Sequence, residues 1–149
     1  ELINEKTYYY KDNKYAGSLM FDQFEIYDDL SITFNPNDKN LILVSISGEI
    51  NFKDNIEDCY KKKEDIVLEI KKMFPNLESY SYTSPHEVDK TGKSVAEATD
   101  FNFENGDNIR IYCMDWSKEL TEKNNWWDGL KVSMSFKKFT DFITNEAYK

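Results

Sequence analysis

The sequence contains very little arginine and histidine. Arg110 is its only arginine and His86 its only histidine among 149 residues. Arginine is the usual residue for bidentate recognition of carboxylate and phosphate groups, so an arginine clamp for such ligands is excluded. The common zinc sites use several cysteine and histidine ligands, so no metal site is expected. His86 follows Pro85 in a polar segment, and we interpret it as a solvated loop residue.

Long apolar runs and linker-like segments are also missing. The longest candidate, Leu41–Ile46, is far shorter than the run of about 20 apolar residues that spans a bilayer, so no membrane span is expected. The few glycines and prolines mark no boundary, and residues 1–149 are interpreted as one domain. The chain starts at Glu1, which a removed signal peptide or a trimmed fragment would explain. Nucleophile-elbow and phosphate-loop motifs are absent, so no catalytic residue or cofactor is predicted.

What the chain does contain is acidic and aromatic. It carries 28 acidic and 19 basic residues, for a net charge of −9. A negative field repels phosphate backbones and anionic lipids, so nucleic acid and membrane surfaces are not expected as partners. Apolar residues make up 40% of the chain and aromatic residues 15%. A disordered chain is poor in such residues, so we expect a packed core built from Phe, Tyr and Ile.

Alternation of apolar and polar residues predicts several β-strands. Residues 30–34 alternate, a turn signal follows at 35–40, and Leu41–Ile50 is the next strand, which together indicate a β-hairpin. Ile42, Val44, Ile46 and Ile50 are expected on one face of that strand. Tyr8–Tyr10 favours a strand by composition, whereas residues 76–94 are interpreted as largely irregular. The remaining alternating runs are 95–103, 109–113 and 130–134.

A second hairpin is predicted around Asn105-Gly106. A two-residue loop would place Phe101 opposite Arg110, whereas a three-residue loop ending at Gly106 places Phe101 opposite Ile109. The second register keeps apolar residues opposite apolar ones, and it requires Gly106 in the left-handed region. We therefore predict the three-residue loop.

Two amphipathic helices are predicted. Residues Asp54–Phe74 have a D-x-x-E start that resembles a capping box, and Pro75 ends the helix. The C-terminal helix, which contains Phe136, Phe139, Phe142, Ile143 and Ala147, is expected to be capped by Ser135. A shorter helix is predicted at Ser117–Lys123. The apolar stripe of the long helix is formed by Ile56, Cys59, Tyr60, Val67, Ile70 and Phe74.

The order of these elements indicates the α+β class. Strands joined by tight hairpins, and helices segregated from them, predict an antiparallel sheet with helices on one face. We expect about five or six strands. The long helix and the C-terminal helix are both expected to pack on the same face of the sheet.

The two cysteines, Cys59 and Cys113, are both expected at the interface between helix and sheet. A disulfide between them would close a loop of about 55 residues and stabilise the fold by ~4 kcal/mol on the chain-entropy model. It would also indicate an oxidising compartment, the periplasm or the cell exterior. Two reduced core cysteines in a cytoplasmic protein are the alternative. A nucleophilic Cys59 is a third interpretation, but the apolar stripe argues against the exposure that it needs.

All three tryptophans flank one connection, together with two aspartates. Adjacent residues of an extended segment face opposite ways, so Trp126 and Trp127 are not both expected in the core. An exposed ring beside Asp and Asn could stack on a sugar, hold a cationic group or contact a partner protein. The candidate ligand-binding residues are therefore Asp115, Trp116, Trp126, Trp127 and Asp128.

Two other interpretations of this segment remain open. In the first, Trp116 and one of the two adjacent tryptophans simply seal the end of the sheet. In the second, Asp115 and Asp128 are paired carboxylates of a glycoside hydrolase.

Three short strings carry a resemblance to other proteins: Cys59–Lys63, Asp89–Ser94 and Cys113–Ser117. From about Leu41 to the C-terminus, the chain resembles small exported proteins, without an assigned activity, of marine bacteria with A/T-rich genomes. The resemblance implies an export signal that this chain does not contain.

The function predicted is that of a small exported acidic binding or interaction module without catalytic activity. Its partner would be a protein or a small ligand. One alternative is a small hydrolase that uses acidic residues near the tryptophan-rich connection, with His86 or Cys59. The other is a structural subunit of a homo-oligomer, joined through an exposed face of the sheet.

Overall fold

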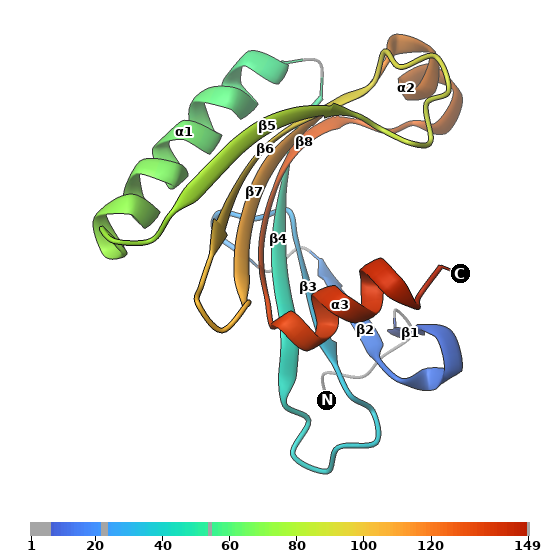
Figure 1. Ribbon diagram of the computed structural model, residues 1–149. Helices are drawn as coiled ribbons and strands as arrows, with labels where there is room; N and C mark the ends of the chain where they lie inside the picture. The colour runs from blue at the N-terminus through green and yellow to red at the C-terminus, as the bar shows by residue number, and fades with distance from the viewer. Residues whose placement is uncertain (1–6, 22–23, 54, 149) are drawn as a thin grey trace.

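The computed structural model describes residues 7–21, 24–53 and 55–148 (Figure 1). Eight antiparallel strands form one sheet in the order β1-β2-β3-β4-β8-β7-β6-β5. The strands are β1 (Thr7–Tyr9), β2 (Ala16–Phe21), β3 (Asp29–Phe34), β4 (Leu43–Lys53), β5 (Ser79–Pro85), β6 (Val95–Asn102), β7 (Asn108–Asp115) and β8 (Asp128–Ser135). The helices are η1 (Lys11–Asn13, a 3₁₀ turn), α1 (Ile56–Met73), α2 (Lys118–Asn124) and α3 (Lys137–Asn145).

The predicted α+β class and antiparallel sheet are confirmed, but the strand count of five or six is too low. The two strands that were missed are β2 and β5. β5 was missed because no apolar residues alternate toward the core along it. It is an edge strand, and its side chains are mostly exposed. The described part of the chain contains no helix that is both long and apolar enough to cross a membrane.

Helix α1 packs on the middle of the sheet and is bonded to it covalently. The Cys59–Cys113 disulfide joins α1 to β7, and both residues are fully buried, so the disulfide interpretation is confirmed. Neither sulfur is a free thiol, which removes Cys59 as a nucleophile. The helix begins after Asn55, whose side chain accepts a hydrogen bond from the Asp58 amide. The expected first residue, Asp54, lies outside the described residues.

Helix α3 lies on the opposite face of the sheet from α1, so the expectation of two helices on one face is wrong (Figure 1). Its Phe139 and Phe142 pack against Tyr15 and Val44. A β-bulge explains why Val44 points that way: Phe34 pairs with Leu43 and Thr33 with Ser45, which leaves Val44 as the extra residue. The bulge reverses the alternation, so Val44 does not share a face with Ile50 as predicted.

The start of α3 also differs from the prediction. The residue that precedes its first turn is Phe136, whose side chain makes no capping hydrogen bond, and the Asp107 carboxylate accepts a bond of 2.9 Å from the amide of Lys137 instead. The expected cap, Ser135, belongs to β8, where its hydroxyl lies 2.7 Å from the hydroxyl of Ser45.

The β6–β7 hairpin follows the predicted register. Phe101 is opposite Ile109, and the amide of Phe103 donates to the carbonyl of Asp107, which leaves a three-residue loop. Gly106 ends this loop with a φ of 86°. The parity of the apolar residues therefore selected the correct turn.

The positions of α1 and α3 leave one broad surface uncovered. Helix α1 occupies one face of the sheet, and α3 crosses the other face near one end of the strands (Figure 1). The tryptophan-rich connection and α2 lie at the opposite end of the strands (Figure 1). One surface of the sheet lies between α3 and α2, on the same side of the sheet as α3 (Figure 1). We call this surface the open face.

Candidate functional site

The connection between β7 and β8 is held closed by Asp128. The Asp128 carboxylate accepts a hydrogen bond of 2.8 Å from the amide of Trp116, so it joins the two ends of the connection. Helix α2 ends at Asn124, and the left-handed conformation of the next residue, Asn125 (φ 55°), turns the chain back toward β8. Asparagine is one of the few residues that tolerates this conformation, and here it directs Trp126 and Trp127 to the end of the sheet.

The loop between β5 and β6 packs against the same connection. The buried carboxylate of Asp89 accepts hydrogen bonds from Thr91 and from Ser94, and these bonds hold its pKa well below its ordinary value. The Ser94 hydroxyl in turn accepts a bond of 2.9 Å from the amide of Ser117, just before α2. The loop is thereby fixed, and it carries His86 to the edge of the open face.

His86 is half-buried, and it is not the solvated loop histidine that the sequence suggested. Its ring centroid lies 4.8 Å from that of Trp116. Its Nδ1 accepts a hydrogen bond of 3.2 Å from the amide of Val88, which assigns the proton of the neutral ring to Nε2.

The three tryptophans divide into a packed pair and an exposed ring. Trp116 and Trp126 pack together, with ring centroids 4.6 Å apart, and seal the end of the sheet. Trp127 remains 42% exposed, with the Lys53 ammonium 5.2 Å from its ring centroid. The expectation that Trp126 and Trp127 do not both enter the core holds in this geometry.

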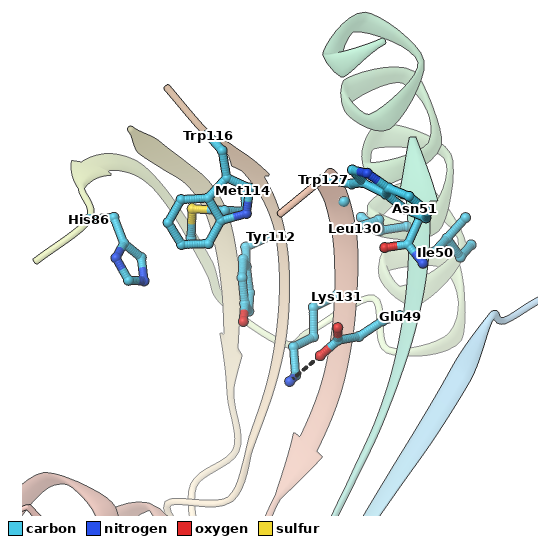
Figure 2. Close-up of a pocket in the computed structure, with 11 residues that line it drawn as sticks. Glu49, Ile50, Asn51, His86, Tyr112, Met114, Trp116, Trp127, Leu130 and Lys131 are labelled. Atoms are coloured by element: carbon cyan, nitrogen blue, oxygen red, sulfur yellow. Dashed lines mark hydrogen bonds and ion pairs between the residues drawn. The ribbon is translucent and has the colours of Figure 1, made fainter. Parts of the chain in front are cut away.

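A pocket of about 220 Å³ lies between these side chains (Figure 2). Figure 2 shows His86 and Trp127 on opposite sides of it, with Trp116 and Met114 between them. Gly129 lies in the sheet between Asn51 and Met114, its partners on the neighbouring strands. Because Gly129 has no side chain, the sheet surface is hollowed at this position.

One row of polar side chains crosses the sheet beside the pocket. Strand pairing places Asp29 next to Glu49, Glu49 next to Lys131, and Lys131 next to Tyr112. Lys131 and Glu49 form an ion pair, drawn as the dashed line in Figure 2. The row therefore offers a carboxylate, an ammonium group and a phenol within one short stretch of the open face.

The protonation states of this row follow from burial and from the neighbouring charges. Burial, and then the charge of Glu49, raises the pKa of Asp29 to about 6. Burial also raises the pKa of Tyr112, which therefore stays a neutral phenol at physiological pH. Burial alone would lower the pKa of Lys131, but the negative charge that Tyr112 acquires at high pH and the Glu49 carboxylate raise that pKa, so Lys131 stays charged.

The structure brings together only part of the predicted site. Trp116 and Trp127 line the pocket, and Trp126 supports Trp116 from behind. Strand alternation places Asp115 on the α1 side of β7, opposite to Met114, and burial raises its pKa. Asp128 is buried and holds the amide of Trp116. Burial raises the pKa of Tyr60 on the α1 side of the sheet, and both carboxylates raise it further, so Asp115 and Asp128 lie outside the pocket, and the paired-carboxylate interpretation stays a prediction.

Sequence reasoning missed the polar half of the pocket, namely Glu49, Asn51, Tyr112 and Lys131. One local signal existed, because Tyr112 falls between the core residues Ile111 and Cys113 and therefore faces away from the core. Alternation alone does not show that Glu49 and Lys131 meet, since that pairing joins strands about 80 residues apart. Within the described residues, no group of three or more His, Cys, Asp or Glu side chains is arranged to hold a metal ion.

Comparison with known proteins assigns the chain to no family: no family model, no curated protein and no solved structure matches it.

Proposed function

We propose that this domain is an exported binding module that holds a small polar ligand in the pocket above Gly129. The observation that supports this most directly is the lining of the pocket. Trp116 and Trp127 form two of its walls, and the Glu49–Lys131 ion pair lies at one end. A concave site with aromatic walls and a few convergent polar groups is the usual form of a small-molecule site.

A saccharide is the ligand class that fits these groups best. A sugar ring has an apolar face that can stack on the exposed ring of Trp127 and hydroxyls that can bond to Asn51 and Glu49. The charges of Glu49 and Lys131 offset each other, which favours a neutral ligand. A cationic ligand fits less well, because Lys53 already lies over the Trp127 ring and Lys131 lies in the pocket.

The disulfide supports export. Disulfides form and persist in oxidising compartments and are rare in the cytosol. The Cys59–Cys113 bond therefore favours a periplasmic or secreted protein. Recovery of the protein from its natural compartment with both thiols free would contradict this part of the proposal.

A glycan panel with calorimetry tests the site. We expect one or more mono- or oligosaccharides to bind, and Trp127→Ala to weaken that binding about tenfold through loss of the stacking surface. Tyr9→Ala is the matched control, because Tyr9 is an exposed aromatic (58%) on β1, far from the pocket in strand order. Failure of every glycan to bind contradicts the ligand class, and unchanged binding by Trp127→Ala contradicts the location.

Hydrolysis of the bound ligand is the second candidate function. Its support is the neighbouring pair Asp29 and Glu49, because the pKa of Asp29 is raised to about 6 while Glu49 is held by Lys131. Two carboxyl groups with different environments are what general acid catalysis requires. Release of reducing ends from a bound glycan, and its loss in Asp29→Asn, would favour the enzyme. Binding without release favours the module.

A further inference from the structure

The outer edge of β5 has no partner among the described residues. β5 is the last strand of the sheet, it is seven residues long, and it contains no charged side chain. Ser79, Ser81 and Thr83 along this strand are all exposed. An edge strand presents unpaired amide and carbonyl groups, and proteins usually protect long edges with charges or bulges. β5 has no charge and no bulge, and its one proline, Pro85, stands at its end.

The hydrogen bonds of the neighbouring turn show which backbone groups of β5 face outward. The amide of His86 donates to the carbonyl of Ser94 at 2.8 Å, so this pair bonds across the β5–β6 ladder. Bonded and unbonded residues alternate along an antiparallel strand, so the even-numbered residues of β5 bond to β6. The amides and carbonyls of Ser79, Ser81 and Thr83 therefore point to the outer edge.

We propose that two copies of this chain pair antiparallel through β5, with Ser81 opposite the partner's Ser81 on a two-fold axis. The outward groups of Ser79, Ser81 and Thr83 then exchange about six hydrogen bonds with the same groups of the partner. Tyr80 lies opposite the partner's Tyr82 on the open face. Aromatic residues in directly opposite positions stabilise a pair of strands.

Tyr80 and Tyr82 select this register over its two neighbours. Both rings already stack within one chain, with centroids 5.6 Å apart, and Tyr80 is 67% exposed. The register centred on Ser81 forms two tyrosine pairs across the seam. The register centred on Tyr82 forms one and places Pro85, which has no amide hydrogen, inside the paired segment. The register centred on Tyr80 places the acidic Glu78 opposite the partner's Tyr82.

Charge limits where a second copy of this chain can bind. A chain with a net charge of −9 repels itself over most of its surface, and β5 is an uncharged stretch where that repulsion is weakest. In the proposed register Glu78 lies opposite the partner's Ser84, so no two acidic residues face each other. The two-fold axis runs through the sheet, so both open faces lie on one side of the dimer. Two ligand pockets would then face the same surface and could bind a repeating ligand together.

A single proline tests whether β5 pairs. Ser81→Pro removes an outward amide hydrogen and leaves the bonds to β6 intact, since proline is tolerated on an edge strand with its nitrogen facing outward. The wild-type protein is expected to reach twice the 17.7 kDa mass of the chain in sedimentation equilibrium, and Ser81→Pro to remain a monomer with an unchanged far-UV spectrum. Ser81→Ala is the matched control and keeps the dimer. A monomeric wild-type protein at every concentration, or a dimeric Ser81→Pro, overturns the proposal.

Three single-cysteine variants test the register. Opposite residues of a hydrogen-bonded antiparallel pair have Cα atoms about 5.5 Å apart, within the range of a disulfide. Ser81→Cys is therefore expected to form a covalent dimer on mild oxidation, whereas Tyr80→Cys and Tyr82→Cys are not. Cross-linking of either tyrosine variant in place of Ser81→Cys overturns the register. The native Cys59–Cys113 bond is fully buried and does not compete.

Discussion

The Lys63 ammonium on α1 lies 2.5 Å from a carboxylate oxygen of Glu97 on β6, and the Lys63 side chain is only 5% exposed. Lys63 faces the sheet, one turn of α1 beyond the disulfide-bonded Cys59. A lysine at such a position must be paired, because an unpaired buried charge is strongly unfavourable. The partner carboxylate is 38% exposed, so the pair lies at the border between core and solvent.

Removal of the Glu97 charge should destabilise the fold much more than removal of the whole pair. Glu97→Gln leaves the Lys63 ammonium without a counter-ion, and we expect a loss of about 2 kcal/mol, between the values typical of surface and buried pairs. Lys63→Met/Glu97→Gln replaces the ammonium with an apolar side chain and should be close to neutral. Urea unfolding measures both, with Lys62→Met as an exposed control on the same helix. Equal losses for Glu97→Gln and the double variant would show that the pair is not coupled.

The disulfide should supply a large share of the stability. Cys59→Ala/Cys113→Ala is expected to lower the free energy of unfolding by ~4 kcal/mol, the value for a loop of this length on the chain-entropy model. Both cysteines are 0% exposed, so we also expect dithiothreitol to reduce the bond only when the protein unfolds. Thiol titration at increasing urea tests this second point. Free thiols in the absence of urea would contradict the burial of the bond.

The hairpin glycine Gly106 should not tolerate a side chain. Its φ of 86° is unfavourable for other residues, and a Cβ there would lie 2.6 Å from the side chain of Lys137. We expect Gly106→Ala to cost about 1–2 kcal/mol in thermal unfolding. In a Lys137→Ala background the contact is removed and only the backbone cost remains. Full recovery of stability in that background would show that the backbone conformation contributes nothing.

The predictions that depend on residues close together in the sequence were mostly correct, and those that depend on contacts between distant segments were mostly not. The long helix and the register of the β6–β7 hairpin depend on local periodicity and on the parity of nearby apolar residues, and both were predictable. The bulge at Val44 was not, because it depends on how β3 and β4 pair, and it determines which face receives α3. The burial of Lys63 on the apolar side of α1 was not predicted either. A lysine is expected at a buried position only when its partner carboxylate is known, and Glu97 lies on a distant strand.

The candidate site shows the same division. An unusual cluster of tryptophans indicated its location, and Trp116 and Trp127 do line the pocket. His86 was expected there only under the hydrolase alternative, because the Asp89–Ser94 hydrogen bonds that fix its loop are contacts of folded structure. The polar row of Glu49, Lys131 and Tyr112 exists only after three strands from distant parts of the chain come together.

Asp29 should make the protein less stable as the pH rises from about 4 to 6. Its pKa is raised from 3.8 to about 6, by burial first and then by the charge of Glu49. Between these two pH values the folded protein holds a proton on Asp29 that the unfolded chain has already released. The folded state binds more protons there, so the free energy of unfolding falls with increasing pH, and the lost stability does not return above pH 6.

Asp29→Asn removes this titration and is the direct test. We expect the variant to be more stable than the wild type at pH 7 and to show a flatter dependence of the urea midpoint on pH between about 4 and 6. Asp65→Asn, an exposed position on α1, is the matched control and should keep the wild-type slope. A loss of stability at pH 7 in Asp29→Asn would mean that the ionised carboxylate is held by Lys131 more strongly than burial and Glu49 oppose it. Asp29, Glu49 and Lys131 would then all be ionised, and Asp29 could not supply the proton that the hydrolytic alternative requires.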